Sequence, residues 1–307
     1  MNRSDALVEP NWLALHLEDP CVRIVDVRWF LPLTGRSAHA EYMAGHVPGA
    51  TFVDLDHDLA AHNMPSGGRH PLPDPANFAR VLGAHGISPS THVVAYDDSA
   101  GSTAARLWWM LKQVGHARVS VLDGGLASWM REGLPIEVGA SPERAPETYP
   151  PAPFSRFGEI VTREEVLPAL GAGAVLLDAR APERFQGRSE PIDPRAGHIP
   201  GARNAPFAGN LEPTVGGTMR FLSSDALRAR FGGRMQLQGG KRARRSRSTF
   251  GSFTPRPRLS NPKSKFQNQT FVPVSFAAPH LLWLLLAPAL WLGWELSRRA
   301  RATERSP

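Results

Sequence analysis

The chain has 307 residues, enough for about two ordinary domains, and an apolar content of 42% is sufficient for hydrophobic cores. A charged fraction of 21% argues against a wholly disordered chain, and a single cysteine excludes a disulfide scaffold and any metal site built on several cysteines. The net charge of +7 is uneven, because residues 233–307 hold 14 Lys and Arg against 2 Asp and Glu, whereas residues 1–232 hold 21 against 26.

The N-terminal segment, MNRSDALVEPNWLALHLED, has no long apolar core after a basic start. It therefore does not match a secretory signal, and a cytoplasmic location is expected.

Short apolar runs alternate with helical patterns in the first half of the chain. Strands covered on both faces are predicted at Val22–Val25, Thr51–Val53, Val93–Tyr96 and Val119–Leu122, and helices between them at Asn77–Gly83 and Ser102–Val114. This alternation predicts an α/β domain with a mainly parallel sheet. Ligands gather at the carboxyl ends of such strands, so the turn from Asp97 to Ser102 is the place where a site is expected.

An internal repeat with an offset of 152 residues is visible in the sequence. Three motifs keep one register, and the paired segments are Asp26–Arg28 with Asp178–Arg180, Gly35–Ser37 with Gly187–Ser189, and His46–Ala50 with His198–Ala202. Such self-similarity predicts two copies of one domain.

The repeat predicts four regions along the chain. They are a first domain at 6–140, an extended Pro-rich linker at 141–157, a truncated second domain at 158–232, and an unrelated tail at 233–307. The second copy resembles the first until about Phe231, but a basic run at 241–247 stands where its next strand is expected. A parallel sheet without its central strands exposes backbone and apolar groups, so the second copy is expected to be unstable unless the tail covers it.

These motifs resemble the tandem-domain rhodanese family, sulfurtransferases that act on thiosulfate or 3-mercaptopyruvate. The resemblance covers about Ala6 to Phe231, and the first copy is closer to the 3-mercaptopyruvate branch. It implies two rhodanese-like α/β domains, of which the first is structural and the second catalytic. The resembling segments are DVRWFLPLTGRSAHAEYMAGHVPGA, VVAYDDSAGSTAARLWWML, VLDGGLASW and LLDARAPERFQGRSEPIDPRAGHIPGARNAPF.

In that family a cysteine in a strand-to-helix loop of the second domain accepts sulfane sulfur as a persulfide, and the loop N–H groups and helix terminus lower its pKa. The resemblance assigns Arg184 and Arg195 to the anionic sulfur donor, because guanidinium groups bind two oxygens at once. The loop is missing from the second copy, and the equivalent loop of the first offers Asp97, a carboxylate that cannot carry a persulfide. We therefore expect a sulfurtransferase by descent, without a catalytic residue and inactive by itself. Its expected partners are a small anionic sulfur donor and a thiophilic acceptor, with no cofactor.

The other residues with reactive, metal-binding or strongly basic side chains are interpreted without a catalytic or binding role. Cys21 precedes the first strand and lacks the electropositive loop of a reactive thiol, so it is interpreted as a strand-edge residue. The His and Asp residues between positions 39 and 62 match no zinc or calcium spacing, so no metal site is predicted. The run 241–247 contains no interleaved aromatic residues, and a solvated segment is favoured over specific nucleic-acid binding.

Residues 271–294 carry no charged residue apart from His280 and are long enough to cross a ~30 Å hydrocarbon layer. Arginines follow them, although three prolines interrupt the segment. A frame change, an insertion and a real membrane anchor remain open as origins of the tail. The alternative function is accordingly a non-catalytic rhodanese-like binding module tethered by this tail. The sulfur donor, the acceptor, the oligomeric state and the existence of a longer active form also remain open.

Overall fold

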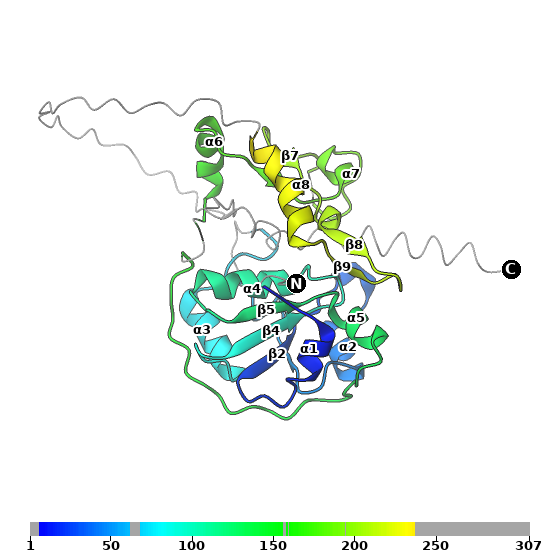
Figure 1. The fold of residues 1–307 in the computed structure, drawn as a ribbon. Helices are drawn as coiled ribbons and strands as arrows, with labels where there is room; N and C mark the ends of the chain where they lie inside the picture. Colours follow the sequence, from blue (N-terminus) through cyan, green and yellow to red (C-terminus); the bar gives the residue numbers. More distant parts are fainter. Residues whose placement is uncertain (1–5, 62–67, 156–157, 159, 194, 237–307) are drawn as a thin grey trace, which may run out of the picture.

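The computed structural model describes residues 6–61, 68–155, 158, 160–193 and 195–236. The basic run at 241–247 and the apolar segment at 271–294 therefore lie outside the described residues. The described part consists of a first domain and a smaller second region on one side of it (Figure 1).

Five parallel strands form the sheet of the first domain, in the order β1-β5-β4-β2-β3. The predicted parallel α/β architecture is thus confirmed, and the four predicted strands are present. The short β1 at the edge was not predicted, because two residues carry no readable pattern. The strands are β1 (Leu7–Val8), β2 (Val22–Asp26), β3 (Thr51–Phe52), β4 (His92–Tyr96) and β5 (Val119–Leu122).

Helices cover both faces of this sheet, and alternate residues of β4 point to opposite faces. Val93 and Ala95 belong to the core cluster that includes α3 and α4, whereas Val94 and Tyr96 belong to the cluster that includes α1 and α5. The helices are α1 (Pro10–Ala14), α2 (Ala38–Ala44), α3 (Pro75–Ala84), α4 (Ala104–Gln113) and α5 (Gly125–Arg131), with a 3-10 turn η1 (Pro32–Thr34).

The second region contains two small sheets instead of one large one. Strands β6 and β7 are parallel neighbours, and β8 and β9 form an antiparallel hairpin. The linker between the two regions has no helix or strand among its described residues. The elements are α6 (Arg163–Gly171), β6 (Leu177–Asp178), α7 (Pro182–Phe185), β7 (Arg203–Asn204), η2 (Phe207–Asn210), β8 (Leu211–Pro213), β9 (Met219–Phe221) and α8 (Ser224–Gln236).

The repeat is structural as well as sequential, since β6 and β7 fall 152 residues after the paired ends of β2 and β3. In each copy an arginine donates to the aspartate two residues earlier and to a glycine carbonyl 17 residues later. The residues concerned are Asp26, Arg28 and Gly45 in the first copy and Asp178, Arg180 and Gly197 in the second.

The strand pair of the second copy is less buried than its counterpart in the first copy. In the first copy β4 pairs along the whole of β2, and Val25 is completely buried. Within the described ranges β6 pairs only with β7, and its Leu177, the counterpart of Val25, is only half-buried. Within the described ranges the second copy thus has one parallel strand pair, and the truncation of its sheet stays a prediction.

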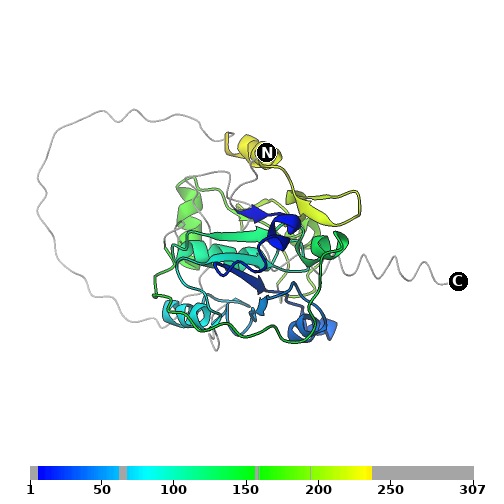
Figure 2. The ribbon, with the colours of Figure 1, turned by 60° about the horizontal axis from the view of Figure 1, so that its bottom comes forward.

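The first domain covers part of the second region. Phe221, Leu227 and Phe231 from β9 and α8 are buried in the same core cluster as α3 and α4. Both views place the β8–β9 hairpin against the first domain (Figures 1 and 2). The first copy thus covers the apolar side chains of this part of the second region. In addition, the predicted junction after residue 232 falls inside α8.

Electrostatic contacts fix this hairpin. The Arg220 guanidinium lies 2.8 Å from Glu9 and 2.5 Å from Glu132. The backbone N–H of Phe221 donates to the carboxylate of Asp123, which follows β5, at 2.9 Å. Asp123 is completely buried, so the hairpin satisfies an acceptor inside the first domain.

Candidate functional site

The loop after β4 is built around the carboxylate of Asp97, which has no exposed surface. Asp97 follows the last residue of β4, and the loop leads directly into α4. Its two oxygens accept five hydrogen bonds of 2.7–3.0 Å, an anion site at the amino terminus of a helix. The donors are the backbone N–H groups of Ser99, Gly101, Thr103 and Ala104 and the hydroxyl of Thr103.

The backbone of this loop turns sharply and lies against the second region. Gly101 lies in the left-handed region at φ 89°, and a Cβ there would meet the ring of Phe221 at 2.8 Å. A glycine is therefore required at this position for two independent reasons. The first-copy loop is thus a closed cradle that already contains its own anion, and a carboxylate cannot accept sulfane sulfur.

Asp98 extends the acidic character of this loop. Its carboxylate lies 3.7 Å from Arg36, whose guanidinium stacks on Phe30 at 3.7 Å and also binds Glu41. One oxygen of Asp98 has no hydrogen-bond partner in the described part of the chain. Burial, followed by the neighbouring charge of Asp97, raises the pKa of Asp98 to about 7.

Arg184, the predicted donor-binding residue on α7, is already bound to carboxylates of its own chain. It is 6% exposed, and its guanidinium donates to Glu190 at 2.6 and 3.1 Å and to Asp193 at 2.8 Å. Arg180 shares the buried Glu190 at 3.4 Å. Because breaking a buried ion pair costs several kcal/mol, an anionic donor would compete with these carboxylates for Arg184.

Arg195 lies exposed on the segment between α7 and β7. Its neighbourhood is held to the end of α7, where the His198 ring bonds the Phe185 carbonyl at 2.7 Å and stacks on the Phe185 side chain. The structure therefore places both predicted arginines in one region but gives them different environments. Their roles in donor binding stay predictions.

This region also contacts the first domain. Ile192 packs against an apolar cluster beyond the carboxyl end of β2, and Asp193 bridges Arg184 and Arg69. Sequence reasoning did not single out Glu190 or Asp193, although both stand in the segment that carries the family resemblance. The cluster consists of Trp29, Phe30, Leu31 and Leu55.

Cys21 is exposed and immediately precedes β2. Its carbonyl accepts the N–H of His92 at the start of β4, so it belongs to the amino end of the sheet. The ranges covered by the structure contain no group of three or more His, Cys, Asp or Glu side chains arranged to hold a metal. No helix within those ranges combines the length and apolarity needed to span a bilayer.

Comparison with known proteins identifies the architecture. Residues 9–132 match the family described as Rhodanese-like domain. The chain is 42% identical over 231 residues to a protein of Pseudomonas aeruginosa named a probable 3-mercaptopyruvate sulfurtransferase, covering 74% of this chain and 78% of that one. It is 41% identical over 214 residues to the 3-mercaptopyruvate sulfurtransferase of Mus musculus, covering 66% and 69%.

Solved structures agree with these sequence matches. SseA from Escherichia coli, reported for its rhodanese fold, is similar with a TM-score of 0.63 at 36% identity, over 74% of this chain and 83% of that one. The repeat, the parallel sheet and the sequence identity all indicate the same protein family. The chain belongs to the rhodanese family and is related to the 3-mercaptopyruvate and thiosulfate sulfurtransferases.

Proposed function

We propose that this chain is a sulfurtransferase of the rhodanese family by descent that does not transfer sulfane sulfur on its own. The named relatives support a small anionic donor, 3-mercaptopyruvate or thiosulfate, and a thiophilic acceptor. The observation that carries the inactivity is chemical: the strand-to-helix loop that can be described presents Asp97, and the one cysteine of the chain, Cys21, precedes β2.

The transfer step requires a thiolate. In the attack on thiosulfate, a new S–S bond forms to the protein while the donor's S–S bond breaks and sulfite leaves with the electron pair. With 3-mercaptopyruvate, the C–S bond breaks instead, and the carbon takes up the thiol proton to give pyruvate. Both reactions leave a persulfide anion on the protein, a species that only a cysteine side chain can carry.

Cys21 is poorly placed to supply this thiolate. It stands before the first residue of β2, whereas Ile192 and Asp193, beside Arg184, contact groups that follow the last residue of β2. The contacts of Ile192 lie past the carboxyl end of β2, a strand of five residues or about 17 Å at ~3.3 Å per residue. A thiol at the other end of this strand cannot reach a donor held at Arg184.

Two turnover assays on the purified full chain test this proposal. Thiocyanate formation from thiosulfate and cyanide, and pyruvate release from 3-mercaptopyruvate, are both expected to stay at the level of the protein-free blank. The Cys21→Ser variant is the matched control and is expected to behave identically. Turnover above the blank that survives removal of contaminating enzyme would contradict the proposal.

A second candidate function is a non-catalytic binding module. It is favoured because Arg184 is already paired with Glu190 and Asp193, so that a small anion would have to displace these carboxylates. Its location in the cytoplasm, or its attachment to a membrane through 271–294, rests on the sequence alone. Carbonate extraction after cell fractionation separates these alternatives, because an embedded segment resists extraction and a soluble or peripheral chain does not.

A further inference from the structure

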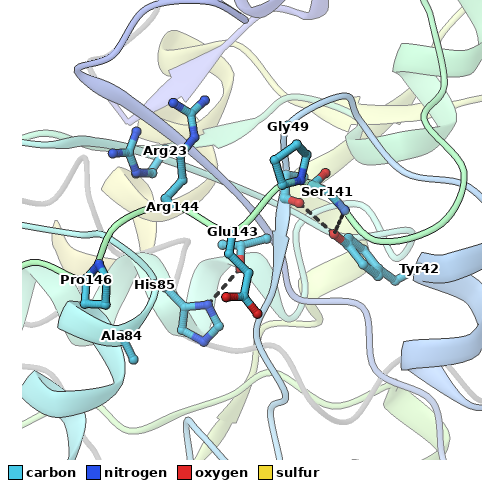
Figure 3. Close-up of a pocket in the computed structure, with 12 residues that line it drawn as sticks. Arg23, Tyr42, Gly49, Ala84, His85, Ser141, Glu143, Arg144 and Pro146 are labelled. Atoms are coloured by element: carbon cyan, nitrogen blue, oxygen red, sulfur yellow. Dashed lines mark hydrogen bonds between the residues drawn. The ribbon is translucent and has the colours of Figure 1, made fainter.

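A cavity of about 280 Å³ lies between the first domain and the linker, and no residue of the Asp97 loop lines it (Figure 3). One wall contains Arg23 near the amino end of β2, Thr51 at the start of β3 and His85 directly after α3. The opposite wall is the linker from residue 141 to 146. Its size is just below the ~300–1,000 Å³ of sites for drug-sized molecules, which favours a small ligand.

Two guanidinium groups meet at this cavity. A Cβ at Gly86 would lie 3.2 Å from Nε of Arg23 and 3.1 Å from Cβ of Arg144, so both arginines crowd the same glycine. Figure 3 shows their side chains next to each other at one end of the cavity. Burial, followed by the positive charge of Arg144, lowers the pKa of Arg23, and the more weakly acting charge of Glu147 offsets only part of this shift. Two like charges this close repel each other unless an anion lies between them.

Arg23 retains unused hydrogen-bonding capacity. Its Nη1 donates to the carbonyls of Pro20 and Val22, and its buried Nε has no partner among the described residues. Neither Arg23 nor Arg144 forms an ion pair with a carboxylate in the same part of the chain. A buried donor without an acceptor is costly, and an oxyanion is the acceptor that guanidinium groups bind best.

The remaining polar groups determine where an anion can sit. Nδ1 of His85 lies 2.8 Å from the Thr51 hydroxyl, and burial lowers the pKa of His85, so this wall provides hydrogen bonds without charge at neutral pH. Glu143 also lines the cavity, and Figure 3 shows its carboxylate beside His85, away from the two guanidinium groups. Its negative charge disfavours an anion at that end.

From this arrangement we propose that the cavity binds one small oxyanion, a phosphate, sulfate or carboxylate group, between Arg23 and Arg144. The site belongs to the first domain and the linker, so it does not depend on sulfur chemistry in the second region. Because the linker supplies Arg144, the bound anion also ties the linker to the sheet.

Isothermal titration calorimetry of the full chain with inorganic phosphate and with sulfate, at constant ionic strength, tests the proposal. We expect saturable binding of one anion, at least tenfold weaker in Arg144→Gln and about threefold tighter in Glu143→Gln. Arg144 is exposed, so its substitution leaves the fold intact, and Arg23→Gln provides a second variant. Arg80→Gln, a change at an exposed arginine of α3 outside the cavity, is the matched control and is expected to bind as the parent does.

Glycerol 3-phosphate in a parallel titration distinguishes two sources of the same group. Tighter binding than phosphate assigns the site to phosphate esters, and weaker binding assigns it to the free ion. Heats that do not saturate, or equal affinity of Arg144→Gln and the parent, would overturn the proposal. Arg184→Gln is expected to leave anion binding here unchanged, which separates this site from the donor site of the family.

Discussion

Replacing Asp97 by asparagine should strongly destabilise the first domain, although the side chain keeps its shape. The carboxylate accepts two backbone N–H groups on one oxygen and two more, with the Thr103 hydroxyl, on the other. An amide has one accepting oxygen, so its NH₂ group must face at least two donors in either orientation.

The magnitude follows from these contacts. Each buried donor without an acceptor costs about 1–3 kcal/mol, so two cost about 2–6 kcal/mol. Loss of a negative charge at the amino terminus of α4 adds about 0.3–1 kcal/mol. We expect Asp97→Asn to lower the free energy of unfolding by about 4 kcal/mol, a large part of the ~5–15 kcal/mol typical of a domain.

Asp98→Asn is the matched control, because it makes the same change in the same loop. The pKa of Asp98 is raised to about 7 in the folded protein, whereas an Asp in the unfolded chain has a pKa of about 4. Between these two pH values the folded protein holds a proton on Asp98 and the unfolded chain does not. This carboxyl therefore lowers stability as pH rises from about 4 to 7. Asp98→Asn should match the parent near pH 4 and be more stable at pH 8.

Urea unfolding followed by tryptophan fluorescence and by far-UV circular dichroism measures both variants, since Trp108 and Trp129 lie in the first-domain core. A loss below about 1 kcal/mol for Asp97→Asn, or equal losses in the two variants, would refute the description of the loop as a cradle that needs its anion.

Further substitutions test the contacts between the two regions and the acid sensitivity of the core. Phe221→Ala should cost about 3–5 kcal/mol, because the ring is 1% exposed in the first-domain core, whereas Val215→Ala at an exposed site should be neutral in the same melts. Arg220→Ala should speed proteolytic cleavage of the β8–β9 hairpin, since it removes contacts to Glu9 and Glu132, and Arg228→Ala at the surface should not; equal cleavage rates would argue against docking of the hairpin. Burial lowers the pKa of His92 to about 4 in the folded protein. Between about pH 6.5 and 4 the unfolded chain binds a proton on this ring and the folded protein does not, so the free energy of unfolding should fall as the pH drops through this range. His92→Gln should flatten this part of the pH profile, and an unchanged slope would assign the acid sensitivity elsewhere.

The sequence predicts the first sheet well, because the apolar runs of β2, β4 and β5 are long enough to be read. The offset of 152 residues also relates β6 and β7 to the paired ends of β2 and β3, and the Asp-x-Arg motif forms the same hydrogen bonds in both copies. In contrast, two-residue β1 and the hairpin β8–β9 carry no period that a pattern could reveal.

The candidate site is less predictable because its key contacts join segments far apart in sequence. Family resemblance assigns Arg184 to a donor, but the nearby Glu190 and Asp193 determine what its guanidinium binds in this chain. The docking of Phe221 beside Gly101, and the meeting of Arg144 with Arg23, depend on how loops cross the sheet. Neither hydrophobic periodicity nor motif spacing contains that information.

The most direct measurement is the intact mass of the purified chain after incubation with 3-mercaptopyruvate or thiosulfate and trapping with an alkylating agent. A side chain that enters the transfer step must carry one additional sulfur atom before an acceptor removes it. We predict an alkylated mass identical to that of the donor-free sample. A donor-dependent gain of one sulfur atom, lost in Cys21→Ser and reversed by cyanide, would show that the solitary thiol does the family's chemistry after all.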